Sequence, residues 1–264
     1  MRRARRRGNP GGVEVVWPLS HNDQDKVILQ LPRGYAGSEL DKIDTSKMRA
    51  TDFPVEEVLV IEALWPDLKP PAVYDFALVP HGAMMQALVE ARALGSYRGQ
   101  PINELENALD NAVLASVRQP CAANIQTSSG PVTRSLCEKR QETDVKPEKF
   151  GLERVGVDFT KYTDYAEQYR GEMAQRDIYF LRDGGGILKT VILCTAEEAK
   201  VVDIGPQYHS DGQCEHKFIE GKLNALVNVH YRRVYLQEWR DVEAAWRKLL
   251  ESFIELEVEN RPVT

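Results

Sequence analysis

Apolar residues along the chain follow two periods, and short runs typical of strands are the more frequent. Each run stops at a proline, a glycine or a polar turn. This pattern predicts strands at residues 26–31, 57–64, 73–79, 151–159, 177–182, 188–194, 214–219 and 223–232. The runs at 177–182 and 188–194 flank Asp183 and three consecutive glycines, which predicts a hairpin. The run at 223–232 alternates apolar and polar positions, which predicts a half-buried antiparallel strand.

Helical spacing occurs in three places. Residues 84–91 and 104–117 each repeat apolar side chains at helical steps, and Asn103 is available as an N-cap for the second stretch. From residue 236 to 254 apolar residues recur every three or four positions, with charged residues on the other side. We therefore predict two helices in the first half of the chain and an amphipathic helix, laid on a sheet, near its end.

Strands and a helical layer in both halves predict an α+β fold with two subdomains, each a mainly antiparallel sheet with packed helices. The expected divisions are a disordered basic tail at 1–12, an N-terminal subdomain at 13–120, a linker or surface excursion at 121–149 and a C-terminal subdomain at 150–264. The excursion is polar and rich in proline.

Charge is distributed unevenly over the 264 residues. The chain has 34 Lys and Arg against 40 Asp and Glu, and five of the arginines lie in residues 2–7. Residues 8–264 therefore carry 29 basic against 40 acidic side chains, a net charge of −11. An acidic body argues against nucleic acid as the main partner and allows a basic protein partner.

The basic tail has three interpretations: a contact with nucleic acid or an anionic membrane surface, the flank of a membrane anchor, or a solvated segment. The glycine-rich residues 8–12 favour the solvated segment, because they will not order the tail against the body. No apolar stretch approaches the roughly 18 to 20 residues that span a bilayer, and no apolar segment of a secretory signal follows the arginines. If the protein is exported, its targeting segment has been removed or lies upstream of residue 1.

Four cysteines, Cys121, Cys137, Cys194 and Cys214, form an even set without a Cys-x-x-Cys pair. Four buried thiols in a cytosolic protein are one interpretation. Disulfides are favoured, because Cys121 and Cys137 bracket a segment rich in Ser, Thr, Gly and Pro, while Cys194 ends one apolar strand and Cys214 precedes another. We predict a Cys194–Cys214 bridge, although four cysteines allow three connectivities.

Sequence motifs of common enzyme classes are missing from the chain. It has no Gly-x-Ser-x-Gly, no phosphate-binding Gly-x-x-x-x-Gly-Lys and no His-Glu-x-x-His. We therefore predict no catalytic residues, no metal and no cofactor.

The strongest contrary hypothesis is a hydrolase or metal-dependent enzyme that uses His209, Asp211 and His216, with Cys194 and Cys214 as further zinc ligands. Side chains of adjacent residues diverge, so His209, the following serine and Asp211 cannot form a relay among themselves. The spacing to Cys194 also matches no common zinc module. A polar loop beside a disulfide is therefore the favoured interpretation.

Two stretches combine tyrosines with polar and acidic residues, a composition suited to protein interfaces. A tyrosine stripe that packs on its own sheet is the alternative. The candidate partner-binding residues are Tyr162, Asp164, Tyr165, Glu167, Tyr169, Tyr208, His209 and Asp211.

Several short motifs stand out in the second half of the chain: GLERVGVDF at 151–159, DIYF at 177–180 running to LC at 193–194, CEHKF at 214–218, YRR at 231–233 and WR at 239–240. Together they resemble periplasmic immunity proteins of type VI secretion lipase effectors. The resemblance covers residues 150–254, with weaker support around 63–70. The absent signal or lipobox is a departure from the family.

The resemblance implies an exported or lipid-anchored protein with disulfides that blocks a toxic phospholipase delivered by neighbouring cells. It implies a periplasmic location, a membrane tether upstream of residue 1, no catalytic residues, and binding over the catalytic cleft or lid of the effector. An adaptor that carries the effector without neutralising it is a further alternative.

Overall fold

A computed structural model gives the structure of the chain. It describes residues 12–20, 25–35, 48–49, 53–71, 83–97, 100–110, 124–127, 130–133, 143–157, 176–195 and 212–254. The predicted strand at 73–79 lies outside these residues. Among the described residues, no helix combines the length and apolar composition needed to cross a membrane.

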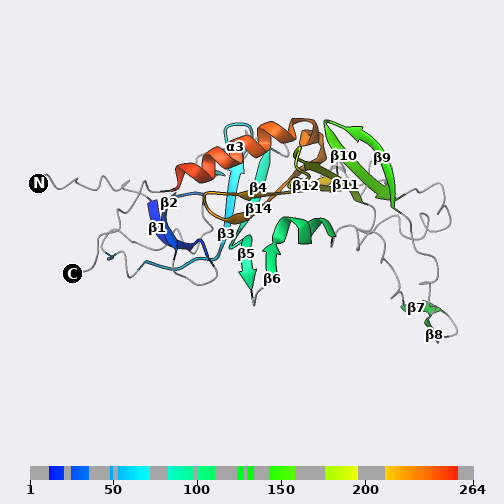
Figure 1. The fold of residues 1–264 in the computed structure, drawn as a ribbon, viewed down its shortest axis with the longest axis horizontal. Helices are drawn as coiled ribbons and strands as arrows, with labels where there is room; N and C mark the ends of the chain where they lie inside the picture. Colours follow the sequence, from blue (N-terminus) through cyan, green and yellow to red (C-terminus); the bar gives the residue numbers. More distant parts are fainter. Residues whose placement is uncertain are drawn as a thin grey trace, which may run out of the picture. The chain divides into compact units, whose positions relative to one another are not determined.

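Antiparallel strands with few helices make up the fold, so the predicted α+β class is confirmed (Figure 1). Eight strands form one sheet in the order β3-β4-β14-β13-β12-β11-β10-β9, and the pairs β1-β2, β5-β6 and β7-β8 form three small sheets. The strands are β1 (Gly12–Pro18), β2 (Lys26–Pro32), β3 (Val58–Leu64), β4 (Met84–Ala91), β5 (Leu94–Tyr97), β6 (Gln100–Asn103), β7 (Asn124–Thr127), β8 (Gly130–Thr133), β9 (Thr143–Lys149), β10 (Leu152–Val157), β11 (Arg176–Arg182), β12 (Leu188–Thr195), β13 (Gln213–Glu220) and β14 (Ala225–Arg232). A 3-10 helix, η6 (Arg233–Glu238), leads into α3 (Trp239–Ser252).

The chain forms two compact units that interleave along the sequence. Unit 1 comprises Met1–Glu104, Phe218–Tyr231 and Glu238–Thr264, and unit 2 comprises Leu105–Lys217 and Arg232–Gln237. Each predicted subdomain, by contrast, is one continuous stretch of the sequence. Compactness does not establish independent folding, so the subdomain bounds 13–120 and 150–264 stay a prediction.

In unit 1, α3 contacts β13, because Nη1 of Arg247 donates a hydrogen bond to the carbonyl of Ile219 over 2.7 Å. The predicted amphipathic helix is confirmed, because Trp239, Val242, Trp246 and Leu250 are buried on one side of it. The guanidinium of Arg247 lies 4.4 Å from the ring centroid of Phe218 in β13, which extends this packing with a cation–π contact.

β4 corrects the helix predicted at 84–91. Met85, Ala87 and Val89 are buried while Met84 and Gln86 are exposed, which is the period of two of a strand. Both neighbours of β4, β3 and β14, pair with it antiparallel along most of its length. A short apolar stretch can match both the period of a helix and the period of a strand. Here the pairing with β3 and β14 makes residues 84–91 a strand.

The structure differs from the sequence-based predictions in three further respects, which concern the burial of one strand and the number of strands. β14 is buried on both faces rather than half-buried. The predicted excursion at 121–149 contains the hairpin β7-β8 and also β9, which pairs with β10. β1, β5 and β6 were not predicted, although Val13, Val15 and Trp17 of β1 alternate as buried residues.

Unit 2 confirms the predicted hairpin. β11 and β12 pair antiparallel from Arg176 opposite Thr195 to Arg182 opposite Leu188. Residues 104–110 are helical, and the remainder of the helix predicted at 104–117 lies outside the described residues. Arg182 binds Glu106 of this helix through a 2.9 Å ion pair.

Truncating the central tryptophan of α3 tests the packing of unit 1. Trp246 is fully buried, so Trp246→Ala leaves a cavity and should lower the free energy of unfolding by about 3–5 kcal/mol in urea titrations. Lys248→Ala, on the exposed side of the same helix, should change it by less than about 0.5 kcal/mol. Equal losses from both variants would contradict the assigned face.

Candidate protein-binding site

Four strand ends of unit 2 lie at the same end of the sheet. β10 ends at Val157, β11 begins at Arg176, β12 ends at Thr195 and β13 begins at Gln213. Val155 pairs with Ile178 and Arg176 with Thr195, which brings the first three ends side by side. We call these four strand ends the loop base.

Both predicted partner-binding stretches leave the sheet at the loop base. Residues 158–175 connect β10 to β11, and residues 196–212 connect β12 to β13. They carry all the candidates, Tyr162, Asp164, Tyr165, Glu167, Tyr169, Tyr208, His209 and Asp211, which lie outside the described residues. The structure therefore brings together the points where the two stretches begin and end.

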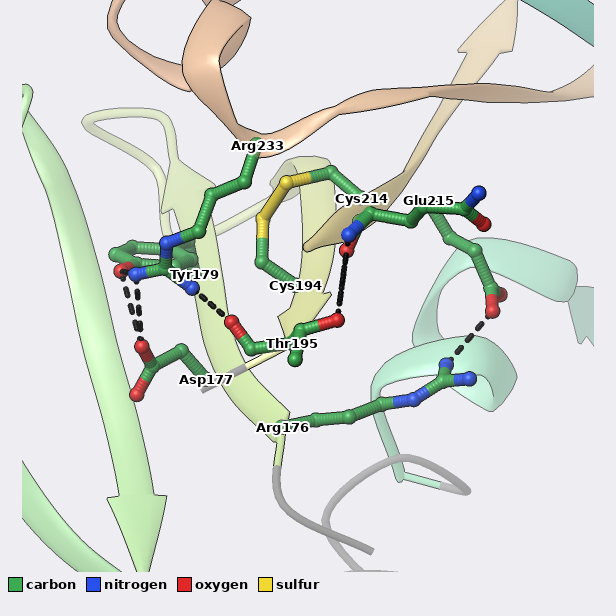
Figure 2. Close-up of a disulfide and its surroundings, with 9 residues drawn as sticks. Arg176, Asp177, Tyr179, Cys194, Thr195, Cys214, Glu215 and Arg233 are labelled. Carbon is green, nitrogen blue, oxygen red and sulfur yellow. Dashed lines mark hydrogen bonds and ion pairs between the residues drawn. A yellow bond between two sulfur atoms is a disulfide. The ribbon is translucent and has the colours of Figure 1, made fainter. Parts of the chain in front are cut away.

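A disulfide joins Cys194 to Cys214, as predicted (Figure 2). It links the end of β12 to the start of β13, and both cysteines are fully buried. Thr195 reinforces the link, because its Oγ1 accepts a 3.2 Å hydrogen bond from the backbone N–H of Gln213. Cys121 and Cys137 lie outside the described residues.

Asp177 holds two arginines at the loop base. Its carboxylate is 1% exposed, and its Oδ1 lies 2.8 Å from Nη2 of Arg154 in β10. Its Oδ2 lies 2.9 Å from Nη2 of Arg233, which follows β14. Arg233 also donates to the hydroxyl of Tyr179 over 2.8 Å and to the carbonyl of Thr195 (Figure 2). The buried carboxylate of β11 thus binds β10 and the residue after β14 directly, and Arg233 extends the network to β12.

Strand geometry explains this arrangement. Asp177 and Tyr179 are two residues apart in β11, so they share a face of the sheet. Arg154 is the register partner of Tyr179, and Cys194 is the register partner of Asp177. The ion-pair cluster is therefore a direct neighbour of the disulfide.

Gly212 allows Arg233 to approach the end of β12. The backbone N–H of Arg233 donates to the carbonyl of Gly212 over 3.0 Å. Gly212 has a φ of 67°, and a Cβ there would lie 3.0 Å from Cβ of Thr195. A larger residue would therefore be strained and would push against Thr195.

Burial determines the chemistry of Tyr179. Burial first, and then the nearby negative charge of Asp177, raise the pKa of the Tyr179 hydroxyl, while Arg233 and Arg154 lower it, and the net result is a pKa of about 12. Tyr179 is therefore a neutral phenol at physiological pH. Such a group can donate and accept hydrogen bonds but cannot serve as a base.

Arg176 and Glu215 add a more exposed link. Nη1 of Arg176 lies 2.7 Å from Oε1 of Glu215, which connects the start of β11 to the start of β13 (Figure 2). Together with the disulfide and the Asp177 cluster, this pair ties the ends of both connecting stretches. The loop base is a rigid support for segments that could contact another protein.

His216 occupies a packed position in β13. It is fully buried, and its Nε2 lies 2.8 Å from Oγ1 of Thr190. Cys194 and Cys214 use their sulfurs in the disulfide, so they are not thiolate ligands for zinc. The described residues contain no group of three or more His, Cys, Asp or Glu side chains arranged to hold a metal.

Sequence reasoning missed the ion-pair cluster of Arg154, Asp177 and Arg233. A signal was present in β11, where Asp177 directly precedes the apolar residues 178–181 and is the one acidic residue of the strand. A buried carboxylate at such a position requires cationic or hydrogen-bonding partners. The identity of those partners depends on strand order, which the local pattern does not contain.

Comparison with known proteins shows a shared fold. No protein-family model matches the chain, and no similar sequence was found among curated proteins. A solved structure, an immunity protein of the Stenotrophomonas maltophilia type IV secretion system, aligns with a TM-score of 0.55 and 18% sequence identity. The alignment covers 92% of this chain and 94% of that protein, so the fold is similar over almost the full length of both.

Removing the Asp177 carboxylate tests the cluster. Asp177→Ala leaves Arg154 and Arg233 without their shared anion, which should lower the free energy of unfolding by about 3–5 kcal/mol. Asp67→Ala breaks an exposed pair with Lys69 and should cost less than about 1 kcal/mol. Similar costs for the two variants, measured by urea unfolding, would contradict the central role of Asp177.

Alkaline pH offers a second test. The folded state holds the Tyr179 proton up to about pH 12, while the unfolded chain loses it near pH 10. The unfolded state then binds fewer protons, so stability should fall as the pH rises from about 10 to 12. Tyr179→Phe should make that fall smaller by about 2 kcal/mol. Tyr231 is also buried, and burial raises its pKa. The stability of Tyr179→Phe should therefore still fall as the pH rises, although less steeply than that of the wild-type protein. An unchanged slope in unfolding experiments across this range would refute the assignment.

Proposed function

We propose that this chain is an immunity protein, which binds a toxic effector delivered by a bacterial secretion system and blocks its activity. The observation that carries the proposal is the likeness of fold to a secretion-system immunity protein over almost the full length of both chains. The sequence resemblance of residues 150–254 to immunity proteins supports it independently. In this function the protein binds but performs no reaction.

The proposed effector is a lipase of the type VI secretion class, as the sequence resemblance implies. The structural neighbour belongs to a type IV system, so the type VI delivery route is proposed from the sequence resemblance alone. The proposed mechanism is steric: the protein covers the catalytic cleft of the effector or holds its lid.

The proposed location is the periplasm, with a membrane tether upstream of residue 1. The Cys194–Cys214 disulfide favours an oxidising compartment, since such bonds persist outside the cytosol. A lipase delivered to the same compartment would meet the protein there.

The proposed contact surface is the pair of stretches at 158–175 and 196–211, with the tyrosine and acidic residues named above. The tied loop base supports this choice, because fixing the ends of a segment before binding reduces the entropy that binding must remove. The acidic body would accelerate encounter with a basic effector surface.

Copurification with the protein encoded beside its gene, followed by a lipase assay of that neighbour, tests the function. A stable complex in which lipase activity is abolished is expected. A complex that retains full lipase activity would favour the adaptor, and hydrolase activity of the isolated chain that is lost on His216→Ala would favour the enzyme. Either result would overturn the proposal.

Charge reversal tests the contact surface. Asp164→Lys, Glu167→Lys and Asp211→Lys should slow association with the effector and reduce its dependence on salt, because each removes a steering charge. Asp67→Lys, an exposed acidic position in unit 1, is the control and should have a smaller effect on the rate. Stopped-flow association rates over a salt series would measure this. Equal effects from the control and the three variants would contradict the proposed surface.

A further inference from the structure

Exposed apolar side chains gather on one face of β3 and β4 in unit 1. Val58 and Val60 are 49% and 41% exposed, and Met84 is 39% exposed. Residues two or four apart in a strand share a face of the sheet, and so do cross-strand partners. Val60 is the register partner of half-buried Leu88, which lies four positions after Met84 in β4. The four side chains therefore share one face, which we call the β3-β4 face.

The opposite face of the same two strands belongs to the core. Its residues Leu59, Ile61, Met85 and Val89 are at most 2% exposed. A strand that is buried on one side ordinarily presents polar residues to water on the other. Single exposed apolar residues are common on protein surfaces, but a group of four on two paired strands forms a patch of the kind that other proteins contact.

Two carboxylates lie on the β3-β4 face beside the apolar side chains. Glu90 is the register partner of Val58, and Glu62 is the register partner of Gln86. Oε1 of Glu62 accepts a 3.2 Å hydrogen bond from Nε2 of Gln86, which is a neutral group. No cationic side chain of the described residues forms an ion pair with either carboxylate. The face is therefore both apolar and negatively charged.

Strand register fixes the spacing of the two carboxylates. Glu90 lies opposite Val58, which is four positions from Glu62 along β3, or roughly 14 Å at 3.4 Å per residue. Val60 and Leu88 form the pair midway between these two positions. Along the strands, the β3-β4 face thus runs from one negative charge across apolar side chains to a second negative charge.

We infer that the β3-β4 face binds a basic protein segment that carries two cationic side chains about 14 Å apart, with an apolar side chain between them. The cations are complementary to Glu62 and Glu90, and the apolar side chain covers Val60 and Leu88. An extended segment with Arg or Lys at positions i and i+4 and an apolar residue at i+2 has this spacing, because alternate side chains point to the same side. The inference does not depend on the proposed function.

Charge disfavours the other occupants of such a face. Glu62 and Glu90 repel an anionic membrane surface or a nucleic acid. A second copy of the chain would bring two acidic faces together, and residues 8–264 already carry a net charge of −11. Arg92, two positions after Glu90, does not reverse the charge of the face, because Glu57 binds it over 3.0 Å. A basic protein segment gains from the same charges.

The synthetic heptapeptide Ser-Arg-Ser-Leu-Ser-Arg-Ser carries the required pattern and serves as the probe. Fluorescence anisotropy of the labelled peptide at low ionic strength should show saturable binding to the full chain. Glu62→Gln and Glu90→Gln should each raise the dissociation constant about twofold to fivefold, and Val60→Ser should raise it as well. Asp241→Asn, at an exposed position of α3, removes the same charge away from the face and should leave the dissociation constant unchanged.

Each alternative gives a distinct result. Absence of saturable binding by the wild-type protein would overturn the inference, and so would a loss of affinity in Asp241→Asn equal to that in Glu62→Gln. Equal binding of Ser-Arg-Ser-Ser-Ser-Arg-Ser would also overturn it, because the apolar contact would then contribute nothing. A dimer in sedimentation equilibrium that Val60→Ser dissociates would assign the face to a second copy instead. None of these results bears on the proposed function, because the effector is absent from every measurement.

Discussion

The buried carboxylate of Asp177 is the contact on which the loop base of unit 2 depends. It receives Arg154 from β10 and Arg233 from beyond β14, and Arg233 extends the network to the carbonyl of Thr195. The disulfide from Cys194 then carries the connection to β13. Segments distant in sequence are thereby held at one end of a sheet. A buried charge of this kind adds little net stability, but it penalises every arrangement in which its partners are separated.

The fixed loop base and the proposed recognition function are physically related. Strands with tied ends supply a scaffold that does not need to reorganise on binding, so the connecting stretches can vary in sequence without loss of the fold. The chain shares its fold with a solved structure, a secretion-system immunity protein, at only 18% identity, which agrees with a fold that tolerates such sequence variation. Affinity would then reside in exposed side chains, and stability in the cluster, the disulfide and the core under α3.

The sequence pattern correctly predicted those elements whose formation depends on residues close together in the chain. The β11-β12 hairpin follows from two apolar runs around Asp183 and three glycines, and α3 follows from a long amphipathic stripe. β4 was misassigned because its eight residues fit both periods, and its pairing with β3 and β14 is non-local. The partners of Asp177 were missed for the same reason, since strand order brings Arg154 and Arg233 to it. The Cys194–Cys214 bridge was predictable because both cysteines adjoin strands that are consecutive in the chain.

Hydrogen–deuterium exchange of the free protein and of its complex with the neighbouring-gene effector tests the central claim most directly. The account predicts slower exchange in the complex at residues 158–175 and 196–211, with little change in α3. Protection confined to unit 1, for example at β3, or an exchange pattern unaltered by the effector would contradict it.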